Sequence, residues 1–186
     1  MSGEQNSVAA PEPAELDAEV VSIVVLRDGR RCVLRRARPG DSGRIYDYFA
    51  RLSPISRAFF HPHPFSVADA RRIACDGTSA RIYRLLALDG QTGVVAGYAF
   101  YEAAVETGGV PVLGIGIADD YQGAGLGRAM MEALIAEARR THREGINLTV
   151  YKNNARAIAL YQSLGFRIVG ETADRKQHTM YLRLET

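Results

Sequence analysis

The sequence has few cysteines. Its 186 residues include only two, Cys32 and Cys75. They form no Cys-x-x-Cys pair and have no histidine at ligand spacing, which excludes a zinc site built on paired thiols and a disulfide framework. We therefore expect two reduced thiols in apolar surroundings and no metal.

Long hydrophobic runs are also missing. No apolar stretch approaches the roughly 18 residues that a membrane-spanning helix needs. Residues 1–7 lack the basic start that precedes the apolar core of a secretion signal. These absences predict no membrane partner and make the cytoplasm the expected location.

A strong excess of one charge is absent as well. The chain has 23 basic and 21 acidic residues, for a net charge of +2, so nucleic acid is not an expected partner. Residues 1–19 carry five acidic side chains and no basic one, are rich in Ala and Pro, and show no periodicity. They are predicted to form a disordered acidic tail. Residues 20–186 are predicted to form one domain, whose oligomeric state the sequence leaves open.

Hydrophobic periodicity predicts a mixed α/β domain. Turn signals such as Asp28-Gly29 and Gly108-Gly109 mark hairpins. The segment Ser53–Phe65, with three prolines and many aromatic residues, is predicted to be a long structured loop. The expected strands are 21–26, 31–37, 82–88, 94–101, 110–117, 146–151, 166–169 and 179–184, and the expected helices are 41–52, 67–75, 128–143 and a short one capped by Asn154.

A glycine-rich turn carries the clearest chemical signal. An apolar strand leads into Gly123, Gly125 and Gly127, and the turn feeds directly into the strongest helix. Free amide groups of the turn and of the first helical turn form an anion site suited to a pyrophosphate. A P-loop is excluded because Arg128 and Ala129 follow the last glycine, and the dinucleotide fingerprint is excluded by the glycine spacing.

At two places the sequence resembles the GNAT superfamily of N-acetyltransferases. The run Gln122-x-x-Gly125-x-Gly127 is similar to the family's acyl-CoA pyrophosphate loop. A second match follows one strand later, in Asn154-x-x-Ala157-x-x-x-Tyr161-x-x-x-Gly165-Phe166. The resemblance covers about residues 31–186 and is sharp over 112–169. It implies a central mixed, mostly antiparallel sheet of six to seven strands flanked by about four helices.

The resemblance also implies acetyl-CoA as co-substrate. In the family, the strand before the turn splays from its neighbour and its free backbone groups bind the pantetheine arm. Gly114 and Gly116 interrupt that strand here, which suggests a bulge or a close approach. The implied cofactor-binding residues are Ile115, Gly116, Ile117, Gln122, Gly123, Ala124, Gly125, Leu126, Gly127, Arg128, Asn154, Ala157 and Tyr161.

The implied reaction is direct attack of a neutral amine on the thioester. By resemblance, Tyr161 is the general acid that protonates the leaving thiolate. Many family members carry a glutamate on the strand before the turn, but Val112 or Leu113 stands there in this chain. Glu102 is the substitute base that we expect; Glu106, Asp119 and Asp120 are alternatives, and the absence of any base is another.

The amine acceptor is the least determined part. The family builds its acceptor site from the first two helices and their loop, so Phe60, His61 and His63 are candidate substrate-binding residues. A histidine there is suited to take an ammonium proton near neutral pH. A small molecule and a protein amine both stay open as acceptors. The rival functions are a catalytically silent acyl-CoA-binding module and a nucleotide-phosphate-binding protein.

Overall fold

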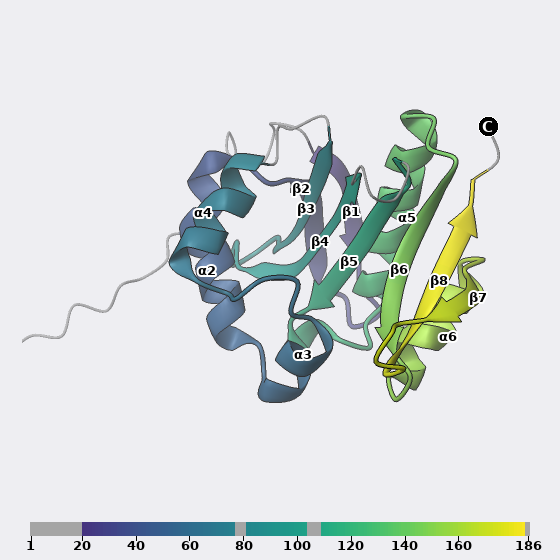
Figure 1. Cartoon of the computed structure of the whole chain (residues 1–186). Coiled ribbons are helices and arrows are strands. Elements are labelled where there is room, and N and C mark those ends of the chain that lie inside the picture. Colours follow the sequence, from purple (N-terminus) through teal and green to yellow (C-terminus); the bar gives the residue numbers. More distant parts are fainter. Residues whose placement is uncertain (1–19, 77–80, 104–108, 185–186) are drawn as a thin grey trace, which may run out of the picture.

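The structure, a computed structural model, describes residues 20–76, 81–103 and 109–184. Its centre is one sheet of eight strands in the order β1-β2-β3-β4-β5-β6-β8-β7 (Figure 1). All neighbours pair antiparallel except β5 and β6, which are parallel. The strands are β1 Val20–Val25, β2 Arg31–Arg36, β3 Ile82–Asp89, β4 Val95–Ala103, β5 Pro111–Ile117, β6 Gly145–Tyr151, β7 Arg167–Glu171 and β8 Gln177–Arg183.

Helices cover both faces of the sheet (Figure 1). The first face carries α2 (Ser42–Arg51), α3 (Pro54–Phe59) and α4 (Val67–Asp76), and the second carries α5 (Leu126–Arg140) and α6 (Ala155–Ser163). The apolar stripe expected on the long helix is confirmed, because all its members are buried: Met130, Met131, Leu134, Ile135 and Ala138. The mixed fold, with a mostly antiparallel sheet, is thus the one predicted. No helix among the described residues is long and apolar enough to cross a membrane.

Two counts differ from the sequence prediction. The described residues form the eight strands that the periodicity indicates, rather than the six to seven that the family resemblance implies, because Val20–Val25 pairs along β2 as an extra edge strand. They form five α-helices rather than about four, because the expected loop Ser53–Phe65 contains α3. Pro54 occupies the first turn of α3, where its missing N–H costs nothing, and the Ser53 hydroxyl accepts a hydrogen bond from the Ser56 amide.

The bulge considered for β5 is absent. The pairing of β4 with β5 runs without a shift from Gly97 opposite Ile117 to Ala103 opposite Pro111. Instead, rings from the first face fill the space that side chains would take: the Phe100 ring lies over Gly114, and the Phe60 ring lies over Gly116. The glycines of β5 thus admit aromatic rings. The predicted tail, residues 1–19, lies outside the described residues.

Candidate active site

The sheet opens between β5 and β6. These parallel strands share a single pair, Val112 with Asn147. Beyond it, Leu113–Ile117 pair only with β4, and Leu148–Tyr151 pair only with β8. A cavity of about 740 Å³ lies where the strands part, and both strands line it. The inner edge of β5 therefore offers free backbone groups to a ligand.

The glycine turn borders one end of this cavity. Gly123 and Gly125 have φ values of 83° and 99°, in the left-handed region that favours glycine. Gly125 is the N-cap of α5, so the unpaired amides of the first helical turn and the positive end of its dipole lie beside the turn. Gly123, Gly125 and Gly127 all line the cavity. This end, which we call the cofactor end, is suited to a phosphate group.

The β1–β2 hairpin braces the turn. The Arg27 amide donates a hydrogen bond to the Ala124 carbonyl at 3.0 Å, and the Arg30 guanidinium donates to the Asp120 carbonyl at 2.8 Å. The Arg30 guanidinium also lies 4.0 Å from the centre of the Tyr121 ring. These contacts place the exposed Arg27 side chain in the cavity lining.

Three arginines from three different elements line the cofactor end. They are Arg27 of the hairpin, Arg128 of α5 and Arg156 of α6. Sequence reasoning found only Arg128. Arg27 gave no signal because it reaches the turn through hairpin docking, and Arg156 occupies a variable position of the second motif.

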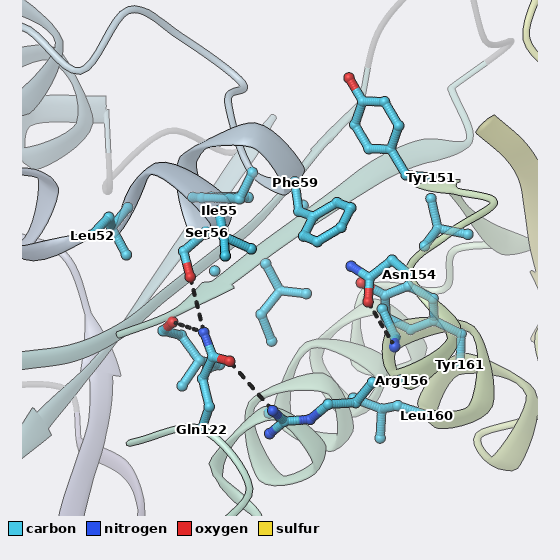
Figure 2. A pocket seen from close by; sticks show the side chains of 18 of the residues that line it. Leu52, Ile55, Ser56, Phe59, Gln122, Tyr151, Asn154, Arg156, Leu160 and Tyr161 are labelled. Carbon is cyan, nitrogen blue, oxygen red and sulfur yellow. Dashed lines mark hydrogen bonds between the residues drawn. The ribbon is translucent and has the colours of Figure 1, made fainter. Parts of the chain in front are cut away.

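A hydrogen-bonded chain joins the cofactor end to α3 (Figure 2). The Gln122 amide nitrogen donates to the Ile117 carbonyl and to the Ser56 hydroxyl, both at 3.1 Å. The Arg156 guanidinium donates to the Gln122 amide oxygen at 3.3 Å. Gln122 therefore ties the end of β5 to α3 and α6.

The second motif forms α6 as predicted. The Asn154 side chain accepts a hydrogen bond from the Ala157 amide at 3.2 Å and so caps the helix. Tyr161 follows Ala157 by one helical turn, and both line the cavity. The Tyr161 side chain is only 8% exposed, and its burial raises the pKa of the phenol to about 12. The phenol therefore stays protonated at neutral pH.

The other end of the cavity is apolar, and we call it the acceptor end. Figure 2 shows Ile55 and Phe59 of α3 facing Asn154 and Tyr161 across the open space. The ring centres of Phe59 and Tyr151 lie 5.9 Å apart, and the Tyr151 hydroxyl lies 3.3 Å from His61 Nε2. The acceptor end is lined by Leu52, Ile55, Phe59, Phe60, His61, Pro62, Phe100, Val112 and Tyr151.

The sequence of the chain matches the Acetyltransferase (GNAT) family over residues 45–166. The chain belongs to this family. The matched residues include both motifs and the segments of β5 and β6 that separate to form the cavity.

Relatives of known name agree with this membership. The chain is 40% identical over 76 residues to the [Ribosomal protein bS18]-alanine N-acetyltransferase of Escherichia coli, covering 41% of this chain and 50% of that one. It is 31% identical over 130 residues to the mycothiol acetyltransferase of Propionibacterium freudenreichii, covering 66% of this chain and 41% of that one. The chain thus spans about half the length of the curated relatives it matches.

Solved structures show the same fold. The GNAT domain of S. lividans PAT superposes with a TM-score of 0.77 at 22% identity, over 94% of this chain and all of that one. The ribosomal-protein-S18-alanine N-acetyltransferase of Escherichia coli gives a TM-score of 0.61 at 26% identity, over 83% of this chain and 95% of that one.

Most of the residues predicted from the GNAT resemblance gather at the cavity. Those lining it are Ile115, Gly116, Ile117, Gln122, Gly123, Gly125, Gly127, Arg128, Asn154, Ala157, Tyr161, Phe60 and His61. Ala124 and Leu126 are buried beneath the turn and are not part of the lining. The Ala124 carbonyl instead accepts a hydrogen bond from the Arg27 amide of the β1–β2 hairpin.

Two other predicted residues lie away from the cavity. Glu102 is exposed on β4 and does not line it. His63 packs against the rings of Phe49, Phe65 and Tyr98, and burial lowers its pKa to about 4. Its imidazole is therefore neutral near pH 7.

Among the alternative bases, only Asp119 lines the cavity, while Glu106 lies outside the described residues. Both Asp119 oxygens accept hydrogen bonds: from the Ser53 amide at 3.0 Å, the Ser53 hydroxyl at 2.7 Å and the Ser56 hydroxyl at 2.8 Å. Burial alone would raise the pKa of Asp119, but these hydrogen bonds outweigh it and lower that pKa. Asp119 is suited to positioning α3 and is a poor proton acceptor.

Proposed function

We propose that the protein is an N-acetyltransferase that moves an acetyl group from acetyl-CoA to a primary amine. One observation carries the proposal: a single cavity joins the glycine turn, the unpaired edge of β5 and the Tyr161 phenol. Relatives named for acetylating a ribosomal-protein alanine and for acetylating spermine and spermidine support an amine as acceptor.

The cofactor end fits the phosphates of acetyl-CoA. Amides of the turn and of the first turn of α5 bind the pyrophosphate, and Arg27, Arg128 and Arg156 surround it with positive charge. Backbone groups of Ile115 and Ile117 on the free edge of β5 bind the pantetheine arm as an added strand would. An amide on this edge also stabilises the oxyanion that forms during attack.

The chemical step exchanges one bond for another. The neutral amine nitrogen forms a bond to the thioester carbonyl carbon, the carbon–sulfur bond breaks, and the thiolate leaves. Tyr161 gives its phenolic proton to the sulfur. The nitrogen loses its second proton as the amide forms, and this proton restores the phenol; the first ammonium proton, lost before attack, is the net proton released. Burial makes the phenol a weaker acid, but it also raises the pKa of the leaving thiol, so the enclosed site offsets the higher pKa of Tyr161 with a greater proton affinity of the sulfur.

His61 is the proton acceptor that the cavity offers to the incoming ammonium. Its imidazole lines the acceptor end and contacts the Tyr151 hydroxyl. Glu102, the base expected from the sequence, stays a prediction that the cavity geometry does not support, because its side chain lies outside the lining.

Thiol release from acetyl-CoA tests the function. The purified chain is incubated with acetyl-CoA and a panel of primary amines, with an amine-free reaction as control. Amine-dependent thiol release with an acetylated product supports the proposal. Tight acetyl-CoA binding without turnover of any amine would instead identify a silent acyl-CoA-binding module. Failure to bind acetyl-CoA would contradict both the acetyltransferase and the binding module.

A further inference from the structure

The acceptor end has an aromatic floor. On the first face of the sheet, β5 presents Gly114 and Gly116, and the rings of Phe100 and Phe60 occupy the space of the missing side chains. Phe100 is only partly buried and Phe60 is 9% exposed, and both rings line the cavity. A ligand resting on this floor therefore meets ring faces and edges instead of polar groups.

Its wall is also apolar. Ile55 and Phe59 of α3 are 71% and 36% exposed, although large apolar side chains are usually buried. Both line the cavity, and the Phe59 ring contacts Tyr151 across it. Exposed apolar side chains that converge on one cavity mark a ligand surface.

The described residues that line the acceptor end carry almost no negative charge, and Glu102, paired with Val112 across β4 and β5, is exposed and outside the lining. Among the described residues that line the cavity, Asp119 is the single carboxylate, and both its oxygens already accept hydrogen bonds from Ser53 and Ser56. The surrounding domain is positive, since residues 20–186 carry 23 basic and 16 acidic side chains. A second ammonium group in the cavity would lose its water without gaining a carboxylate.

We propose that the acceptor is a primary amine with a single positive charge on an apolar, preferably aromatic, body, and that polyamines are excluded. The inference rests on the proposed function and names its substrate class. A free arylalkylamine and the N-terminal residue of a peptide with apolar side chains share this chemistry. The apolar body lies on Phe60 and Phe100 and against Phe59, and its amine points toward Tyr161.

A matched pair of amines tests the charge rule. Hexylamine and 1,6-diaminohexane have the same chain length and differ in the second amine, and phenethylamine and spermidine extend the pair. We expect kcat/KM for hexylamine and phenethylamine to exceed that for the diamine and spermidine by at least about tenfold. The measurement is steady-state thiol release at saturating acetyl-CoA, with the acetylated product confirmed by mass.

Variants of Phe59 test the wall. Phe59→Ala should raise KM for phenethylamine by about tenfold, and Phe59→Asp should shift the preference toward 1,6-diaminohexane by a similar factor. Val169→Asp is the matched control, because Val169 is 60% exposed on β7, outside the cavity, and receives the same charge. Acetyl-CoA affinity, measured separately, should stay unchanged in all three variants, which excludes a general loss of structure.

The outcomes separate this inference from the function beneath it. Turnover that favours the diamine or spermidine overturns the charge rule and leaves the N-acetyltransferase assignment intact. Acetyl-CoA binding without turnover of any amine overturns both. A tetrapeptide with an apolar N-terminal residue, compared with phenethylamine, distinguishes the two sources of the same chemistry, and turnover of either supports the proposal.

Discussion

The two ends of the cavity differ in the chemical groups that line them. The cofactor end consists of backbone amides, glycines with positive φ and the three arginines. The acceptor end consists mostly of apolar and aromatic side chains, contributed by α3, the segments that flank it, and strands β4, β5 and β6. Backbone recognition depends on the conformation of the chain, whereas side-chain recognition depends on residue identity. Changes at the cofactor end should therefore affect every reaction equally, and changes at the acceptor end should alter which amine reacts.

The largest effect is expected where the two ends meet, at Tyr161. Tyr161→Phe keeps the ring and its packing against Phe166, whose centre lies 6.0 Å away, and removes only the acidic hydroxyl. We expect kcat to fall roughly 10²-fold with every amine, with little change in acetyl-CoA affinity. Tyr83→Phe is the matched control, because Tyr83 is buried outside the cavity. An unchanged kcat in Tyr161→Phe would show that Tyr161 is not the general acid.

The same residue predicts a pH profile. Because burial raises the pKa of Tyr161 to about 12, the phenol keeps its proton at every pH below that value and loses it only above. The wild-type kcat should therefore show no basic decline up to about pH 10. A decline near pH 9 that disappears in Tyr161→Phe would show that the phenol ionises far more readily than its burial allows.

A smaller effect is expected from the backbone of the turn. Gly125 has φ of 99° and its missing Cβ would meet no atom within 4 Å, so Gly125→Val strains the chain without a clash. Such strain costs about 1–3 kcal/mol, and relieving it moves the amides, so acetyl-CoA should bind about 10- to 100-fold more weakly. Calorimetric titration measures this affinity.

Gly109 provides the control for that change. Its φ of 86° and open surroundings match those of Gly125, but it lies outside the cavity lining. Gly109→Val should carry a similar conformational cost and bind acetyl-CoA with unchanged affinity. Equal affinities of the two variants would contradict the assignment of the turn to the phosphates.

The smallest effect is expected from Arg27. Its exposed guanidinium contributes screened charge, so Arg27→Ala should weaken acetyl-CoA binding about three- to fivefold at low salt and less at high salt. Arg31→Ala removes the same charge from the same hairpin at a residue outside the cavity lining, and should leave the affinity unchanged. Indistinguishable affinities of the two variants would place Arg27 outside the phosphate site.

The cofactor end could be predicted from the sequence because its signals are local. Glycine spacing and the Asn154 cap determine backbone conformation within a few residues, and both lie where the motifs predicted. The acceptor end could be predicted only in part: Phe60 and His61 line it, but the rest depends on contacts between distant segments. The three prolines of Ser53–Phe65 indicate a loop, so α3 is not predicted from the sequence. No local sequence pattern indicates that Phe60 packs on Gly116 or that Arg27 lies beside the turn.

The packing of Phe60 on Gly116 constrains how this protein can change over generations. A methyl group at residue 116 would overlap the Phe60 ring and lie 2.6 Å from the Tyr48 hydroxyl. Reducing Phe60 removes one of these two overlaps and leaves the other, so a side chain at 116 also requires the buried Tyr48 ring to shift or to be replaced. Gly116 is therefore expected to change last, after both rings have changed, and a new acceptor pocket of this kind requires three substitutions in that order.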